Sequence, residues 1–370
     1  MRVRLVIDSV NRQWIIGKMA DRLASALREL DFDAEVDEGP SDAVDVNHWM
    51  LYLQPWRHYY SAPGFFEPQW RPAPTKHTAM ITHVDDPVKV QIVRDSIGKI
   101  LDAGICMSRM TMSELAGYGI DAARLTYVNP AHDDAVNPRR FIIGMTTKRY
   151  GDGRKREDDL LLVARKVRLD AFRFEIIGDG WEAVAEELRR AGAEVDLAPS
   201  DRGYGYILER LPHFDYYLYA GWDEGSMGTL DALAAGVKTI ITPQGFHLDL
   251  KGGITHPFHD EAELAAVFQA IADDRKVRID SVKNWTWNEY ARRHASIWRA
   301  LLEGRPLAAA IPIEEGHTPI LESDLTRAKQ RLRSRTFKSE FWPYFLESRR
   351  FWMRGKLARL KRWLLRRNRR

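Results

Sequence analysis

Short apolar runs alternate along the chain with longer segments in which apolar positions recur every three or four residues. The first run, residues 2–8, predicts a buried strand, and residues 14–30 predict a helix. Strands that alternate with helices indicate a mostly parallel sheet with helices on both faces. In this first part of the chain, further strands are predicted at 44–53, 78–82, 104–107 and 124–129, and further helices at 89–101 and 111–118.

The same pattern restarts at residue 141, after a polar stretch at 130–140 that contains prolines and predicts a linker. We therefore expect a second doubly wound α/β unit. In such units ligands bind beyond the carboxyl ends of the strands, so the loops that follow the strands are the places to look for function. Strands are predicted at 141–144, 172–177, 194–197, 216–219 and 239–242, and helices at 158–168, 181–191, 204–211 and 228–235.

Length and composition agree with two domains. The chain has 370 residues, of which 45% are hydrophobic and 29% charged, the balance of a folded globular protein. A long helix is predicted at 285–302. The expected organisation is an N-terminal α/β domain over 1–135, a second α/β domain over 136–284, a helix over 285–303, and a loop with a basic tail over 304–370.

Several features of the sequence predict a cytoplasmic protein. No apolar run approaches the roughly 18 residues of a transmembrane helix, and residues 1–8 have the pattern of a strand rather than of a secretion signal. The single cysteine, Cys106, lies in an apolar stretch and cannot form an intramolecular disulfide. A buried and unreactive thiol is the expected state of this residue.

Positive charge is concentrated at the carboxyl end. Residues 326–370 contain 17 Lys and Arg against two acids, a net charge of +15, so the other 325 residues carry −11 of the total +4. From Phe351 onward, Trp and Leu recur at helical spacing among arginines, which is typical of a helix that lies on an anionic membrane. Nucleic acid would also attract the arginines, but it does not explain the apolar array. We expect a peripheral contact with the inner face of the cell membrane and no nucleic-acid partner.

The segment with the most chemical information is residues 223–236, which read D-E-G-S-M-G-T-L-D-A-L-A-A-G. Small residues before a helix leave its first amides exposed, and these amides together with the helix dipole can hold a phosphate. An acidic residue further into the helix, Asp231, could reach a ribose hydroxyl. The alternative is an ordinary helix start that Asp223 or Ser226 caps.

This segment resembles the GT-B glycosyltransferases, and among them the group with a Glu-x7-Glu motif, whose pattern E-G-F-G-L-x-x-L-E-A-M-A-x-G is one residue longer than the stretch 224–236 of this chain. The resemblance implies two Rossmann-like domains that face a central cleft. It also implies that the first acid faces the transferred sugar and that Asp231 holds the ribose. Glu224 is favoured as the first acid, and Asp223 is the alternative. The residues between the two acids that would line the donor site are Gly225, Ser226, Met227, Gly228 and Thr229.

Two further segments occur in the order that this group uses. A strand followed by Gly178, Asp179 and Gly180 resembles the turn that lines its nucleotide site. The loop at 146–155 carries four cations, and related enzymes place an Arg and a Lys there against the donor diphosphate. Fixed cations would stabilise the departing phosphate without a metal ion, although a solvated run of charges is the alternative. Arg149 and Lys155 have the matching spacing, and Lys148 and Arg154 are the other candidates.

In the first domain, His83 and Asp85 follow a predicted strand and would face the same cleft. Enzymes of the resembling group often place a histidine in this loop against the sugar or the acceptor, and Asp85 could act as a general base in an inverting reaction. A structural histidine is the alternative. An aromatic segment at 49–70 provides either cover for the sheet or an acceptor site, for which Tyr59, Tyr60 and Trp70 are candidates.

Together these features predict a glycosyltransferase. The resemblance implies transfer from a nucleotide diphosphate sugar, held by the second domain, to a glycan or lipid-linked acceptor held by the first, with retention of configuration. The expected setting is the synthesis of a bacterial surface polysaccharide or glycolipid. We expect no cofactor and no bound metal. The alternatives are a sugar-nucleotide 2-epimerase and a non-catalytic protein with the same fold.

Overall fold

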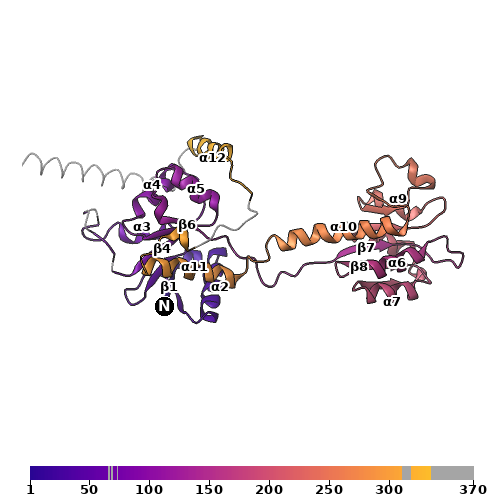
Figure 1. The fold of residues 1–370 in the computed structure, drawn as a ribbon, viewed down its shortest axis with the longest axis horizontal. Helices are drawn as coiled ribbons and strands as arrows, with labels where there is room; N and C mark the ends of the chain where they lie inside the picture. Colours follow the sequence, from indigo (N-terminus) through magenta and orange to yellow (C-terminus); the bar gives the residue numbers. More distant parts are fainter. Residues whose placement is uncertain (66, 68–69, 73, 311–317, 335–370) are drawn as a thin grey trace, which may run out of the picture. The chain divides into compact units, whose positions relative to one another are not determined.

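The computed structural model describes residues 1–65, 67, 70–72, 74–310 and 318–334 (Figure 1). The chain forms two compact units. The first unit combines Met1–Asp134 with the chain from Asn284 onward, and the second unit is Ala135–Lys283. Each unit is built around its own sheet and its own apolar cores.

The first unit contains six parallel strands in the order β2-β1-β3-β4-β5-β6. The chain leaves β1 to one side and then continues on its other side, so the unit is doubly wound and its topological switch point lies between β1 and β3. The strands are β1 (Arg2–Val6), β2 (Asp33–Asp37), β3 (Val46–Trp49), β4 (Lys76–Ile81), β5 (Ala103–Cys106) and β6 (Leu125–Tyr127).

Both faces of this sheet are buried. Neighbouring residues of a strand point to opposite faces, and in β1 the side chain of Leu5 packs into one core while that of Val6 packs into the other. The central strands β3, β4 and β5 are therefore buried at almost every position. One face is covered by α2 (Ile15–Glu29) and α11 (Trp287–Leu302), which lie side by side (Figure 1), and the other by α3 (Gln54–Tyr59), α4 (Pro87–Ser96) and α5 (Arg109–Gly117).

The second unit repeats this architecture with the strand order β12-β11-β10-β7-β8-β9. Its switch point lies between β7 and β10. The strands are β7 (Phe141–Met145), β8 (Phe172–Ile177), β9 (Glu194–Ala198), β10 (Tyr216–Tyr219), β11 (Lys238–Ile241) and β12 (His256–Pro257). On one face pack α6 (Glu157–Lys166), α7 (Glu182–Arg190) and α10 (Glu261–Asp280), and on the other α8 (Gly203–Arg210) and α9 (Met227–Ala234).

The two sheets confirm the prediction of two doubly wound α/β domains. The bounds of β8 and β10 are those predicted. The predicted helix over 89–101 is wrong at its end, because α4 stops at Ser96 and Gly98 takes a left-handed backbone with φ of 78°. The hydrophobic pattern did not identify β2, α3, α10 or β12.

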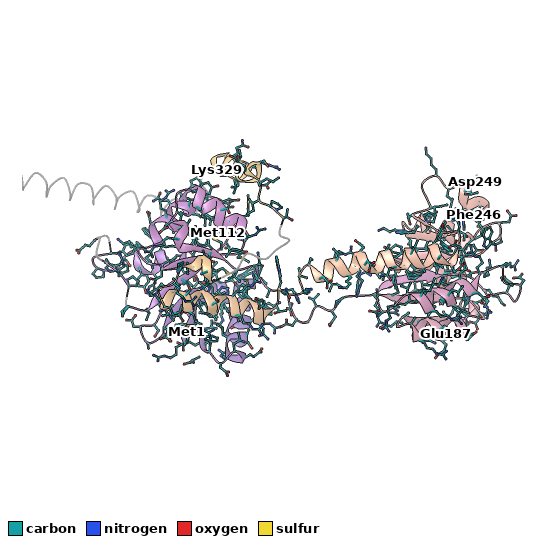
Figure 2. The ribbon with its side chains drawn as sticks, viewed as in Figure 1. Met1, Met112, Glu187, Phe246, Asp249 and Lys329 are labelled. Atoms are coloured by element: carbon teal, nitrogen blue, oxygen red, sulfur yellow. The ribbon has the colours of Figure 1, made fainter. Side chains whose placement is uncertain are left out.

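The basic tail is described only in part. A helix, α12 (Glu322–Ser334), lies beside α5, where Lys329 approaches Gly117 at the end of α5. Figure 2 labels Lys329 on this helix and Met112 on α5. Residues 335–370, which carry most of the predicted membrane-binding pattern, lie outside the described residues. Among the described helices, none is both long enough and apolar enough to cross a membrane.

A buried polar cluster fixes α11 to the first sheet. The indole Nε1 of Trp298 donates to Thr78 Oγ1 at 3.1 Å, and the same hydroxyl bonds His48 Nδ1 at 2.9 Å. His294 Nδ1 bonds the carbonyl of Tyr290 at 2.9 Å, and the rings of His48 and His294 lie 5.1 Å apart. Burial lowers the pKa of both histidines, and for His294 the value falls to about 4.

The buried histidines predict a loss of stability in acid. Between pH 6.5 and about 4 the unfolded chain takes up a proton that folded His294 refuses, so the free energy of unfolding decreases as the pH falls. The size of this loss is about 3 kcal/mol from His294. We expect His294→Phe to reduce the drop in Tm between pH 7 and pH 5, measured by thermal unfolding. His132→Phe, at an exposed histidine of the same unit, should keep the full drop, and an unchanged drop in His294→Phe would contradict this account.

Candidate functional site

Four loops of the second unit follow β7, β8, β10 and β11 at the carboxyl edge of the sheet, around its switch point. Backbone hydrogen bonds connect them. The amide of Trp222 donates to Arg154 O at 2.8 Å, that of Arg149 to Asp179 O at 3.0 Å, and that of Phe246 to Glu224 O at 3.1 Å. The three segments that the sequence singled out, the loop at 146–155, the turn at 178–180 and the junction at 223–231, therefore belong to one connected site.

The centre of this site is an ion pair between the first and third segments. Lys155 Nζ lies 2.8 Å from Asp223 Oδ2 and donates to the hydroxyl of Tyr219 at 2.7 Å. The same hydroxyl donates to Asp223 Oδ1 at 2.5 Å, which closes a triangle of three polar groups. Tyr219 is the last residue of β10, so the strand itself positions the triangle.

Burial distinguishes Lys155 from the other loop cations. Its side chain is 11% exposed, against 54% for Lys148 and 44% for Arg154. Burial raises the pKa of Asp223, but the hydrogen bonds from Lys155 and Tyr219 lower it by more than burial raises it. The pKa of Asp223 therefore lies below its ordinary value. Asp223 is therefore ionised at neutral pH, and it holds a charged ammonium group at the edge of the sheet.

Lys148 and Arg149 lie against the turn after β8. Lys148 Nζ is 3.5 Å from Asp179 Oδ2, and Arg149 Nη1 is 3.5 Å from the carbonyl oxygen of Gly180. Asp179 also accepts a bond from the Ser200 amide at 3.0 Å. Gly178 has φ of 151°, and a Cβ there would lie 2.3 Å from the Thr147 carbonyl oxygen, so only glycine allows this close approach of the two loops.

The start of α9 is only partly open. We expected its first amides to be free, but the Ser226 amide donates to His247 Nε2 at 3.0 Å and the Ser226 hydroxyl bonds Tyr217 at 3.0 Å. Within the described part of the chain, the amides of Met227 and Gly228 have no hydrogen-bond acceptor. These two amides remain as donors for an anion at the helix start.

The two acids after Asp223 lie in different places. Glu224 is exposed, and its carboxylate makes no hydrogen bond or ion pair to the residues that the structure describes. Asp231 lies one turn into α9 and accepts a bond from the hydroxyl of Tyr204 at 2.8 Å. Asp223 is thus held in the ion pair, while Glu224 is the acid that points away from internal partners. Thr229, at the buried side of α9, is fully covered.

Sequence reasoning missed three residues of this site. Tyr219 ends an apolar strand and had no motif to mark it. His247, in the 3-10 helix η4 (Gly245–Asp249), is completely buried and bonds the Thr242 carbonyl oxygen through Nδ1 at 3.0 Å. Figure 2 labels Phe246 and Asp249 of the same short helix. Trp222 is 59% exposed, with the Arg156 guanidinium 5.2 Å from its ring. Its position directly before Asp223 was the only signal in the sequence.

The candidates of the first unit follow β4. His83 is exposed and has φ of 47°, and its carbonyl oxygen accepts bonds from Tyr52 and Lys89. Asp85 lies two residues before α4 and pairs with Lys89 of that helix at 2.8 Å, so its carboxylate already has a partner. Both residues lie at the carboxyl edge of the first sheet, and their roles stay predictions.

Most aromatic side chains of the segment 49–70 pack against the first sheet. Trp49, Tyr52, Trp56 and Phe65 are buried in the core of the first unit. Tyr59, Tyr60 and Trp70 are partly buried against the same core, and the ring of Tyr59 lies 5.5 Å from that of Trp70. Cys106 is buried as expected, and burial raises the pKa of its thiol to about 12.

No family model matches the chain, and no curated protein matches it. Among solved structures, Anabaena Alr3699/HepE in complex with UDP is 11% identical at a TM-score of 0.28, over 84% of this chain and 97% of its own. The catalytic domain of cholesterol-α-glucosyltransferase from Helicobacter pylori is 16% identical at 0.30, over 45% and 99%. WaaG, a glycosyltransferase involved in lipopolysaccharide biosynthesis, is 11% identical at 0.30, over 85% and 100%. Scores this low carry no weight for function, so the fold rests on the strand order and the site on its geometry.

The role of His247 can be tested directly. We expect His247→Phe to leave the Ser226 amide and the Thr242 carbonyl without partners in a buried place, at a cost of about 2 kcal/mol. Amide hydrogen exchange at Ser226 should become faster, and the Tm should fall. The exposed His259, changed to Phe, serves as control. Unchanged exchange at Ser226 in His247→Phe would show that the ring does not hold this junction.

Proposed function

We propose that the second unit binds a nucleotide diphosphate sugar and that the protein is a glycosyltransferase. The observation that carries the proposal is the ammonium of Lys155, on a side chain that is only 11% exposed, fixed by Asp223 and Tyr219 at the switch point of a parallel sheet. An oriented cation beside a helix start with two open amides suits a diphosphate. The sequence resemblance to Glu-x7-Glu enzymes of the GT-B class supports the same assignment.

In the proposed reaction the bond between the anomeric carbon and the diphosphate oxygen breaks, and its electron pair leaves with the diphosphate. Lys155, together with Arg149 or Lys148, stabilises this developing charge. We therefore propose that the transfer needs no divalent metal ion. An acceptor hydroxyl forms the new bond to the anomeric carbon. Its proton passes to the departing phosphate oxygen, and configuration is retained.

Glu224, Asp231 and His83 also have places in this scheme. Glu224 faces the transferred sugar because Asp223 is held in the ion pair. Asp231 bonds the ribose, and its present partner Tyr204 lies at the surface of the same unit. The first unit binds the acceptor, a glycan or a lipid-linked sugar, near His83. The basic tail attaches the protein to the inner face of the membrane, where a lipid-linked acceptor for a bacterial surface polysaccharide or glycolipid would be found.

The decisive variant is Lys155→Met. We expect donor binding by calorimetry to weaken and kcat/KM for transfer to fall by about 100-fold or more, because the leaving diphosphate loses its fixed cation. Lys166→Met, at an exposed lysine of α6, is the matched control and should keep both. Glu224→Gln should lower kcat more than donor affinity.

Two results would contradict the proposal. Wild-type donor affinity and rate in Lys155→Met would remove Lys155 from the site. Clean conversion of a sugar nucleotide to its epimer, with no acceptor present, would identify an epimerase.

The tail gives a separate prediction. We expect the full chain to sediment with vesicles that contain anionic lipid and not with neutral vesicles, because the net charge of +15 in 326–370 attracts anionic headgroups. A chain truncated after residue 334 should lose most of this binding while it keeps donor affinity. Equal sedimentation of the truncated and full chains would contradict the role of the tail.

A further inference from the structure

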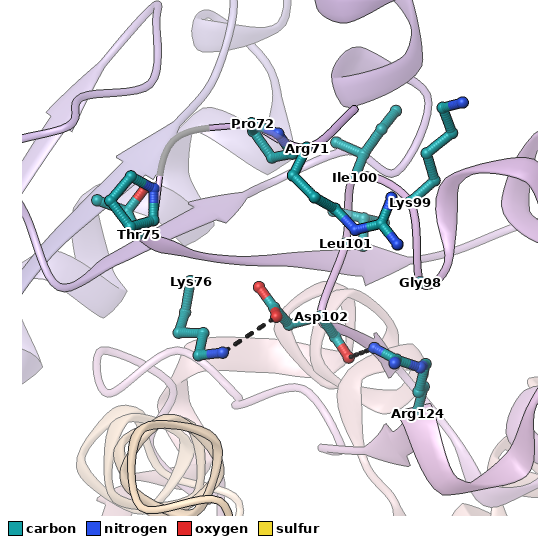
Figure 3. A pocket seen from close by; sticks show the side chains of 11 residues that line it. Arg71, Pro72, Thr75, Lys76, Gly98, Lys99, Ile100, Leu101, Asp102 and Arg124 are labelled. Atoms are coloured by element: carbon teal, nitrogen blue, oxygen red, sulfur yellow. Dashed lines mark hydrogen bonds and ion pairs between the residues drawn. The ribbon is translucent and has the colours of Figure 1, made fainter. Parts of the chain in front are cut away.

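The hollow drawn in Figure 3 holds charged side chains that are already paired. It lies in the first unit and has a volume of about 250 Å³. Lys76 Nζ lies 3.3 Å from Asp102 Oδ1, and Figure 3 marks this pair with a dashed line. Arg124 Nε lies 3.5 Å from Asp121 Oδ2. A charged ligand would have to separate these pairs before it could bind there.

In the second unit, the loop after β9 connects two parts of the candidate donor site. It contains the 3-10 helix η2 (Ser200–Arg202) and leads into α8. At its beginning the amide and the hydroxyl of Ser200 both donate to the carboxylate of Asp179, in the turn after β8. At its end the hydroxyl of Tyr204 donates to Asp231 Oδ2 at 2.8 Å. The loop therefore holds Tyr204 against α9, although the sequence predicted no chemistry for this segment.

The bond of Tyr204 to Asp231 contributes little to stability. Tyr204 is 59% exposed, so water competes for both groups of the bond. The bond raises the pKa of the Tyr204 hydroxyl, which therefore stays protonated at neutral pH and remains the donor. The main effect of the bond is on the orientation of the Asp231 carboxylate.

One oxygen of Asp231 remains for a ligand. A carboxylate accepts hydrogen bonds through two oxygens, and Tyr204 occupies only Oδ2. Oδ1 accepts no hydrogen bond from the residues that the structure describes. Because Asp231 is partly exposed, Oδ1 is the acceptor that is left for a hydroxyl group of a ligand.

The position of Asp231 in α9 suits the ribose of a nucleotide. The open amides of Met227 and Gly228 precede Asp231 by four and three residues, which is one turn of the helix, roughly 5 Å along its axis. Side chains of a helix lean toward its N-terminus, so the carboxylate leans toward these amides. A nucleotide with its diphosphate at the helix start therefore has its ribose within reach of Asp231.

We propose that Tyr204 is a positioning residue for the nucleotide, because its hydroxyl holds Asp231 so that Oδ1 accepts a hydrogen bond from a ribose hydroxyl. A carboxylate that is already oriented loses less freedom when the ribose binds. A nucleotide that lacks the hydroxyl leaves this acceptor without its donor. Tyr204 thereby sets a preference of the site for ribonucleotides over deoxyribonucleotides. The inference rests on the proposed function, since it requires a nucleotide in the second unit.

The test is calorimetry of the full chain with UDP, ADP and GDP, each compared with its 2′-deoxy and 3′-deoxy forms. For a base that binds, the wild type should prefer the ribonucleotide over at least one deoxy form by about tenfold or more, because a bond to a charged acceptor is lost. Tyr204→Phe should reduce this preference to about threefold or less and leave the affinity for that deoxy form unchanged. Tyr206→Phe, in the same helix, is the matched control and should keep the preference.

A double-mutant cycle separates positioning from a structural effect. Asp231→Ala should abolish the preference, and Tyr204→Phe should have no further effect on it in that background. Equal weakening of ribonucleotide and deoxyribonucleotide binding in Tyr204→Phe would identify a structural role for the hydroxyl and overturn the inference.

The outcomes also distinguish this inference from the proposed function. A wild type that binds ribonucleotides and deoxyribonucleotides equally, with binding that Lys155→Met still weakens, would overturn the role of Tyr204 and leave the donor site standing. If none of the nucleotides binds, or if Lys155→Met binds them as the wild type does, the proposed function fails and this inference fails with it.

Discussion

The pairing of β7 with β10 is the constraint on which the candidate site depends. These strands are neighbours in the sheet but are separated in the chain by β8 and β9, and Tyr217 lies opposite Gly144. A Cβ on Gly144 would lie 1.9 Å from the ring of Phe214, so a larger residue would displace this ring from the face of the sheet that it covers. Since Lys155 follows β7 and Asp223 follows β10, their ion pair exists only while this register holds.

The ion pair of Lys155 with Asp223 distinguishes the two adjacent acids that the shortened motif offers. A lysine that is almost covered needs a close opposite charge, because an unpaired buried cation is costly. Asp223 meets this need and Tyr219 adds a third bond. An acid that neutralises Lys155 cannot at the same time be held toward a sugar, so the proposed function assigns the substrate contact to the adjacent Glu224. From the sequence alone, both Asp223 and Glu224 were candidates for the first acid, because their spacing does not show which of them pairs with Lys155.

The sequence predicted best those elements and residues whose signal lies within one short segment of the chain. β8 and β10 were predicted with correct bounds. β10 is an unbroken run, Y-Y-L-Y, and β8 has apolar residues at 172, 174, 176 and 177 and ends directly before Gly178. β2 was missed because it is an acidic edge strand, D-A-E-V-D, in which only Ala34 is buried. In α10 the apolar face is confined to the first half of the helix, which hides its period. The loop cations and glycines were found as residue types, but Tyr219 and His247 act through contacts between distant segments, which no local pattern contains.

The ion pair also determines what the site can do before a ligand arrives. Asp223 and Tyr219 hold the Lys155 ammonium in one position, so a bound diphosphate would meet a cation that needs no reorganisation. The same carboxylate would compete with the diphosphate for the ammonium, which limits ground-state binding. Its second oxygen is shared with Tyr219 and the Gly225 amide, so part of its charge is already compensated inside the loop. In the proposed transfer, the leaving diphosphate gains charge as the sugar departs. Its attraction to Lys155 would therefore increase along the reaction and lower the barrier as well as the dissociation constant.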